Sequence, residues 1–255
     1  YSVTGVQTCA LPISTVLVYE RSQPGGVQPW RLQKELYGWL SCHTSHGNTY
    51  CHNDGFGMAV GLDAEQLVVG APQDGEHWRG MTHFYERNEG GAGSWGRVGR
   101  ANQHTRHERE YVGNNLAVDG FAAILGSYSE TAEVDGSGGN AYLYCRDAGG
   151  LSGSWNYHQR FPVWAVNWVA VALSGNLLAI GVPVENLVHL HARNRGGKDQ
   201  WGLVATLRSP SSTYVGDFGG RVAISGDTLV VGPVPFGDRP ASVFIFQRNE
   251  GCAEQ

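Results

Sequence analysis

A hairpin-like segment that recurs along the chain constrains the fold more than any other feature. It first reads FGMAVGLDAEQLVVGAP, at 56–72, and related segments follow that also end in glycine. These glycines are Gly70, Gly126, Gly181 and Gly232, at steps of 56, 55 and 51 residues. Fourteen residues before them, in the same order, stand Phe56, Val112, Asn167 and Phe218. A period of this size indicates one supersecondary unit that is stacked on copies of itself.

Each hairpin is followed by a third apolar run that ends in arginine. These runs are THFYERN, AYLYCRD, VHLHARN and SVFIFQRN, and TVLVYERS at Thr15 is the same element without a preceding hairpin. After four of the five comes a tryptophan that opens a more polar segment: Trp30, Trp95, Trp155 and Trp201. The unit therefore has four short strands.

The strands are often apolar on both alternating faces, as in Phe244, Ile245 and Phe246. Burial on both faces requires sheets stacked against sheets. The sequence thus predicts an all-β fold, a β-propeller of four-stranded antiparallel blades. A sandwich of sequential hairpins is the alternative, but it does not explain the period.

The residues at the hairpin ends have structural explanations. A glycine that ends a strand adopts conformations closed to other residues or lets a neighbouring chain approach closely, and a proline after it ends the pairing because it has no N–H. Phe56 and Phe218 each place a large ring beside a glycine. We expect these rings to wedge one sheet against the next.

The repeated segments resemble the FG-GAP repeats of integrin α-subunit-like β-propellers, in particular the short-hairpin bacterial and algal type. The resemblance extends from Thr15 to about Gly251 and rests on FGMAVGLDAEQLVVGAP and FGGRVAISGDTLVVGPVP with the runs that follow them. It implies a ring that usually has seven blades. Residues 15–255 then form an incomplete propeller: strands three and four of one blade, three complete blades, and strands one to three of a further blade. A small ring closed by its own end strands is the alternative.

Calcium-binding members of that family carry an Asp-rich loop of the DxDxDG kind between the first two strands. Here the corresponding turns are GLDAEQ, VDGF, LSGN and ISGD, each with at most two acidic residues. A Ca²⁺ ion needs six to eight oxygen ligands. We therefore expect no calcium site and no other cofactor, and we interpret Asp63, Glu65 and Asp227 as turn-forming or solvated residues.

The first fourteen residues are set apart from the rest. Their sequence, from Tyr1 to Ser14, back-translates to codons that look like a sequencing-library adapter. We interpret 1–14 as a non-native, adapter-derived segment and exclude it from the fold argument. On this interpretation the native N-terminus is missing, and the absence of a signal peptide has no meaning.

Two cysteines bracket a polar loop, CHTSHGNTYC, at Cys42 and Cys51. A local disulfide would fit an oxidising compartment. The same loop with His43, His46 and His52 is a candidate zinc site, because thiolate and imidazole are common zinc ligands. Free thiols and histidines without a special role are the third interpretation.

Charge and motifs exclude several function classes. The net charge is −5 and the 18 basic residues are dispersed, which does not favour a nucleic-acid partner. No apolar run is long enough to span a bilayer. The stretch HTRHEREY at 104–111 lacks the HExxH pattern, and no phosphate-binding loop, nucleophile elbow or sialidase Asp-box is present. We therefore expect no enzyme activity.

Four tryptophans lie outside the repeated column: Trp39, Trp78, Trp164 and Trp168. Trp78 stands in the longest hairpin loop with other polar residues, and this loop at 74–80 is the candidate ligand site: Asp74, Glu76, His77, Trp78 and Arg79. The resemblance implies an extracellular or cell-surface module that binds a protein or glycan partner. The alternative is a propeller that serves as the scaffold or catalytic domain of a carbohydrate-active enzyme.

Overall fold

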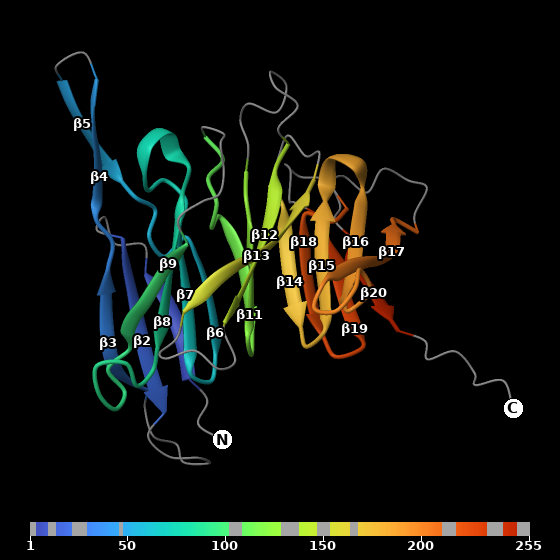
Figure 1. The fold of residues 1–255 in the computed structure, drawn as a ribbon, viewed down its shortest axis with the longest axis horizontal. Helices are drawn as coiled ribbons and strands as arrows, with labels where there is room; N and C mark the ends of the chain where they lie inside the picture. Colours follow the sequence, from blue (N-terminus) through green and yellow to red (C-terminus); the bar gives the residue numbers. More distant parts are fainter. Residues whose placement is uncertain are drawn as a thin grey trace, which may run out of the picture. The chain divides into compact units, whose positions relative to one another are not determined.

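The computed structural model describes ten segments of the chain: 4–9, 14–21, 30–45, 48–101, 109–128, 138–146, 154–163, 168–210, 218–233 and 242–248. The chain divides into two compact units, Tyr1–Trp168 and Val169–Gln255. In the described segments both are built of β-strands, with two short 3-10 turns, η1 (Glu76–Trp78) and η2 (Pro183–Glu185) (Figure 1). The fold is therefore all-β, as the sequence predicts.

The first unit holds three antiparallel sheets and one additional hairpin. Its first sheet has the strands β1 (Thr4–Cys9), β2 (Thr15–Arg21) and β3 (Trp30–Tyr37), and the hairpin has β4 (Leu40–Ser45) and β5 (Asn48–Asn53). The second sheet has β6 (Ala59–Asp63), β7 (Gln66–Ala71), β8 (Met81–Glu86) and β9 (Gly96–Ala101). The third sheet has β10 (Asn115–Asp119), β11 (Ala122–Gly126), β12 (Asn140–Arg146) and β13 (Trp155–Pro162).

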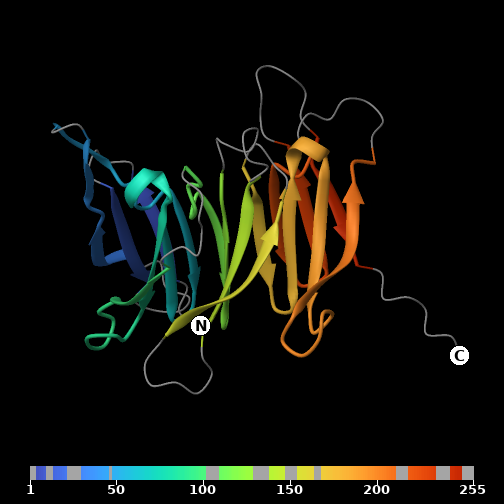
Figure 2. The same ribbon diagram turned by 45° about the horizontal axis from the view of Figure 1, so that its top comes forward.

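The second unit holds two more sheets of the same kind. One has four strands, β14 (Ala170–Ser174), β15 (Leu177–Val182), β16 (Leu187–Arg193) and β17 (Trp201–Arg208). The other has β18 (Arg221–Ser225), β19 (Thr228–Gly232) and β20 (Phe244–Gln247). In every sheet each strand pairs with the next one along the chain (Figure 2). The four-stranded unit predicted from the repeat is thus confirmed in three complete copies.

The repeat is visible in the details of pairing. Two residues connect the first and second strands in each of the four hairpins, and three of these turns begin with a glycine at positive φ: Gly120, Gly175 and Gly226. Such turns match the right-handed twist of the strands they join. The ladder between the third and fourth strands of the repeat is irregular in all four sheets that have both. The register shifts between residues 18 and 19 in β2, 84 and 85 in β8, 143 and 144 in β12, and 190 and 191 in β16.

The second strand of each repeat lies in the interior, and in two of the repeats its last glycine lies against the main chain of the next sheet. A Cβ atom at Gly70 would stand 2.0 Å from the carbonyl oxygen of Gly113, and one at Gly181 would stand 1.9 Å from that of Gly219. The glycine is therefore required by close approach. Pro72 follows directly after the last paired residue of β7, as expected of a residue without an N–H.

The rings that begin the hairpins pack between successive sheets. Phe56 is buried in one cluster with Val16 and Val18 of the first sheet, and Phe218 is buried in another with Ala172 and Val188. This confirms the predicted wedge at both phenylalanines. Val112 occupies the same position between the second and third sheets.

The tryptophans of the fourth strands differ in burial. Trp95 and Trp201 are buried, and Trp155 stacks on Phe84 with ring centroids 4.7 Å apart. Trp30, in contrast, is 46% exposed. Trp95 and Trp155 pack against the preceding sheet, and no described sheet precedes that of Trp30.

The acidic residues of the turns have partners. Asp63 Oδ2 accepts a hydrogen bond of 2.6 Å from the N–H of Gly120 in the next sheet's turn, and Ser174 Oγ accepts one of 3.1 Å from Gly226. Glu65 Oε1 lies 3.4 Å from Arg87 Nη1, and Asp227 Oδ1 lies 3.6 Å from Arg248 Nη1. Asp63 therefore links two turns, a role that the interpretation as a solvated charge does not include.

β1 and β20 are edge strands of their sheets. Residues 4–9, within the segment interpreted as adapter-derived, form β1 and pair with β2. Ladder hydrogen bonds join backbone groups, so this pairing is compatible with a native or a non-native origin. At the other edge strand, β20, Phe244 and Phe246 pack on Phe218, but Ile245 is 72% exposed. The expectation that all three residues of this run are buried is wrong for Ile245, since it lies on the uncovered face of an edge strand.

Candidate binding site

The predicted loop at 74–80 is a compact turn closed by its own backbone. The N–H of Gly80 donates to the carbonyl oxygen of Asp74 at 3.0 Å, and the N–H of Asp74 donates to that of Ala71, also at 3.0 Å. His77 and Trp78 have positive φ values of 59° and 52°. Non-glycine residues rarely adopt this conformation, and it is often associated with functional loops. The loop therefore holds Trp78 in a defined orientation.

Asp74 is a half-buried acid in this loop. Burial raises the pKa of its carboxyl, while the hydrogen bond from the N–H of Gly75 to Oδ1, at 2.7 Å, lowers it. Smaller effects come from Asp54, which raises the pKa, and from Arg100 and His52, which lower it. Its carboxylate is thus partly removed from water and favours hydrogen-bond donors.

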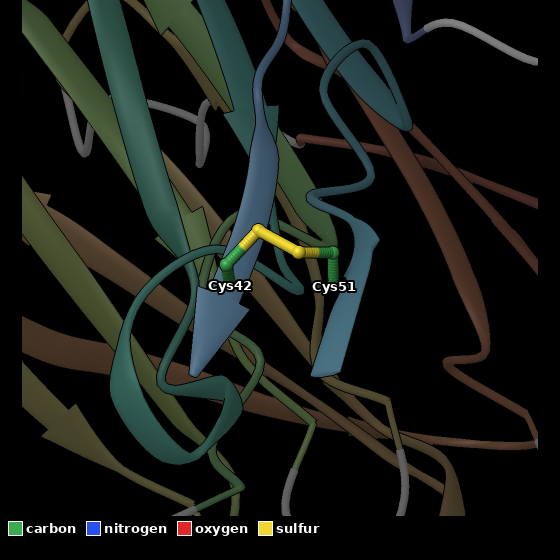
Figure 3. Close-up of a disulfide and its surroundings, with 2 residues drawn as sticks. All are labelled: Cys42 and Cys51. Carbon is green, nitrogen blue, oxygen red and sulfur yellow. A yellow bond between two sulfur atoms is a disulfide. The ribbon is translucent and has the colours of Figure 1, made fainter. Parts of the chain in front are cut away.

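The hairpin β4–β5 packs against this loop at its base. Cys42 and Cys51 lie opposite each other in the ladder and form a disulfide, with Cα atoms 4.1 Å apart (Figure 3). With both sulfurs in this bond, neither is available as a zinc ligand. Beside it, His52 Nε2 accepts a hydrogen bond of 2.9 Å from Trp78 Nε1. The disulfide therefore stabilises the element that contacts Trp78.

His52 has a second contact through the same nitrogen. Nε2 lies 2.9 Å from the carbonyl oxygen of Gln73, to which it donates only when it carries a proton. An indole N–H can only donate, so Nε2 must be unprotonated to accept from Trp78. The two hydrogen bonds are mutually exclusive, because a tautomer with its proton on Nε2 donates to Gln73 and cannot accept from Trp78.

Five rings form a continuous row, which we call the aromatic row: His52, Trp78, Tyr111, Tyr128 and Trp168. Successive ring centroids are 5.8, 6.5, 5.6 and 6.0 Å apart. The guanidinium carbon of Arg109 lies 5.2 Å from the centroid of the Trp78 ring. The first four rings are half-buried and Trp168 is 42% exposed. The row therefore presents partly exposed aromatic surface from several loops of the first unit.

Buried acids hold the chain segments that begin two of the repeats. Asp54, two residues before Phe56, accepts hydrogen bonds from the N–H of Trp39 at 2.6 Å and of Phe56 at 2.9 Å. Glu110, two residues before Val112, is buried as well.

Glu110 has side-chain partners on the third sheet. It accepts hydrogen bonds from Asn140 Nδ2 at 2.7 Å and from the hydroxyl of Tyr142. Burial and the adjacent Glu110 raise the pKa of Tyr142 strongly, so its hydroxyl stays a donor. Glu110 thereby positions its chain neighbours Arg109 and Tyr111, both of which contact Trp78.

The structure brings some of the predicted site residues together and adds others. Asp74 and Trp78 both border His52, His77 is exposed, and Arg79 is half-buried. The side chain of Glu76, the residue Trp164 and the stretch 102–108 lie outside the described part of the chain. Trp39 is 70% exposed.

The sequence prediction missed His52, Tyr111 and Tyr128. A signal for them exists, because these residues lie shortly before the start of a hairpin or shortly after the glycine that ends its second strand. In a four-stranded meander both segments belong to the same end of the sheet. A search for rings in these segments of successive repeats would have found the row.

Within the described segments, no three His, Cys, Asp or Glu side chains form a group that could hold a metal ion. No helix among them has the length and apolarity to cross a bilayer.

Comparisons with known proteins support the fold. No family model and no curated protein matches the sequence. A solved structure described as "Complex of KlAtg21 with coiled-coil of AgAtg16" is similar over 92% of this chain, with a TM-score of 0.53 and 12% sequence identity. The chain spans 63% of the length of that structure. The class that fold and comparison define is an all-β protein of repeated four-stranded antiparallel sheets.

Proposed function

We propose that this chain is part of an FG-GAP-type β-propeller and acts as a non-catalytic recognition module for a protein or glycan partner. The aromatic row carries this proposal, because it joins partly exposed rings from separate loops at one site. Tyrosine, tryptophan and arginine supply large contact areas in recognition surfaces. Binding sites are commonly formed by loops on a rigid scaffold.

Three observations support the propeller part of the proposal. The sheets are four-stranded meanders, they repeat at the period of the sequence, and the same glycine contact joins two successive sheets in each unit. Stacked four-stranded sheets of this kind form propeller blades. A ring of seven blades, of which this chain is a part, is the assembly that the resemblance favours.

A disulfide in the hairpin supports an extracellular or cell-surface location, because such bonds persist in oxidising compartments. The proposed module works without a cofactor. The solved structure with a similar fold is described as a complex with a coiled coil, and by analogy of fold this favours a partner-binding role.

Screening for a ligand tests the proposed function. The purified chain is immobilised and probed with arrayed glycans and with arrayed cell-surface ectodomains, beside its Trp78→Ala and Trp30→Ala variants. We expect at least one ligand whose binding Trp78→Ala weakens by about tenfold or more, and which Trp30→Ala leaves unchanged. Trp30 is a matched control, because it is a partly exposed tryptophan at the first residue of β3, away from the row. Binding that is equal in the two variants contradicts the proposed site.

A further inference from the structure

The shape of the aromatic row favours a linear ligand. Each ring lies beside the next one in the row, with centroids 5.8, 6.5, 5.6 and 6.0 Å apart. Neighbouring planes are inclined at 69°, 8°, 48° and 56°, so the rings follow one another without forming a flat patch. Globular partners generally need a broad interface of about 800 Å² on each side. A chain-like ligand contacts such a row along its length.

The polar groups near Trp78 define the chemistry of that ligand. Asp74 is a half-buried acid that acts only as an acceptor when ionised, and Arg109 acts only as a donor. A ligand must therefore offer both hydrogen-bond donors and acceptors beside surfaces that pack on aromatic rings. Sugar rings have this combination, since their hydroxyls donate and accept while their C–H faces are apolar.

Other chain-like ligands fit less well. Proline-rich peptides also bind aromatic surfaces, but proline has no N–H to donate to Asp74. The indole N–H of Trp78, a donor for peptide carbonyls, is already engaged by His52. Single-stranded nucleic acid stacks on rings but needs a positively charged groove, whereas this chain has a net charge of −5.

We propose that the aromatic row binds a linear glycan, with sugar units packed against Trp78, Tyr111, Tyr128 and Trp168 and with hydroxyls bonded to Asp74 and Arg109. This inference rests on the proposed recognition function and names its ligand class. Glu110 is a positioning residue in this site, because its buried carboxylate holds the segment that carries Arg109 and Tyr111.

Titration calorimetry with defined oligosaccharides tests the inference. The probes are cellohexaose, laminarihexaose, mannohexaose and chitohexaose, each with the intact chain and with three variants. We expect at least one probe to bind. Trp168→Ala and Asp74→Asn should each weaken that binding by about tenfold, whereas Trp30→Ala should change it less than twofold.

The Trp168→Ala variant should fold normally, because this ring is 42% exposed and its loss should not disturb the core. A loss of binding in this variant therefore reports on the site and not on misfolding. The absence of binding by all four probes, or equal loss in the Trp30→Ala variant, overturns the glycan inference. If an ectodomain nevertheless binds and its binding depends on Trp78, the glycan inference has failed but the recognition function stands. If neither probes nor arrayed ligands bind, both have failed.

Discussion

The glycine at the end of the second strand shows how one residue joins two sheets. Gly70 has no side chain where the carbonyl of Gly113 passes, and Gly181 repeats the arrangement with Gly219. Any Cβ atom at these positions must displace main chain rather than a flexible side chain. A side chain at either position therefore destabilises the packing between the two sheets.

Gly70→Ala should therefore destabilise the protein by about 1–3 kcal/mol or more, as overpacking of an interior commonly does. Gly99→Ala is the matched control, because its nearest neighbour would be Phe84 Cδ2 at 3.9 Å. We expect Gly99→Ala to change the free energy of unfolding by less than about 0.5 kcal/mol. Urea unfolding followed by tryptophan fluorescence measures both, and equal effects would refute the explanation.

His83 is a buried histidine on β8 whose two ring nitrogens have no hydrogen-bond partner. Burial lowers its pKa from 6.5 to about 4, with Arg97 and Arg100 acting in the same direction and Asp54 against it. Between these two pH values the unfolded chain binds the proton and the folded chain does not. The free energy of unfolding should thus be highest above pH 6.5 and fall as the pH is lowered toward 4.

The shift at His83 corresponds to a loss of about 3 kcal/mol at most over that range. His83→Phe keeps a ring beside Phe56 and removes the titration, so the pH dependence should become flatter. Burial likewise lowers the pKa of His191 to about 4, and this residue adds a slope that His83→Phe leaves in place. Chemical denaturation at a series of pH values provides the measurement. An unchanged slope in the variant would assign the dependence to other groups.

At the scale of elements, the hairpin β4–β5 differs from the repeated strands. It lies between the first and second sheets in the chain, and no other described connection contains such a hairpin. Its disulfide and the His52 contact link it to the loop that carries Trp78.

Replacing Cys42 and Cys51 by serine should therefore affect binding more than folding. The hairpin is outside the stacked sheets, so we expect a change of less than about 1 kcal/mol in the free energy of unfolding of the sheets. Amide hydrogen exchange should increase in β4 and β5 and in 74–80, while ligand affinity falls. Exchange that rises equally in β7 and β11 would show that the disulfide supports the core instead.

Much of the element structure could be predicted from the sequence, since strands such as LVVG at 67–70 are short, apolar and bounded by glycine and proline. The burial of Phe56 between two sheets could also be predicted from its residue type. Residue type alone does not predict the aromatic row. His52 and Tyr128 are far apart in sequence, and the rings of Trp78 and Tyr111 lie between them in the structure, so only their places within the repeats connect them. No sequence pattern marks Asp54 and Glu110 as buried acids, and only the fold shows that backbone and side-chain donors surround them.

At the scale of the whole molecule, the division into two compact units implies that a substitution in one unit destabilises mainly that unit. Repeat proteins are stabilised by each unit and its nearest neighbours, so destabilisation does not spread evenly along the chain. Gly70→Ala should increase hydrogen exchange in β6, β7, β10 and β11 and leave β14–β19 near their original rates. Gly181→Ala should give the reverse pattern. Exchange measured by mass spectrometry at increasing urea separates the two, and a uniform response would indicate a single cooperative unit.

The contact between glycines also bears on how such a chain can change over generations. Where two sheets meet through backbone atoms, the contact requires glycine but no matched pair of side chains at that point. A repeat that keeps this glycine and the buried ring that begins its hairpin can then be duplicated or given new loops while the contact remains compatible. Variation is free to accumulate in the loops that carry Trp78 and Tyr128, and the scaffold beneath them stays interchangeable.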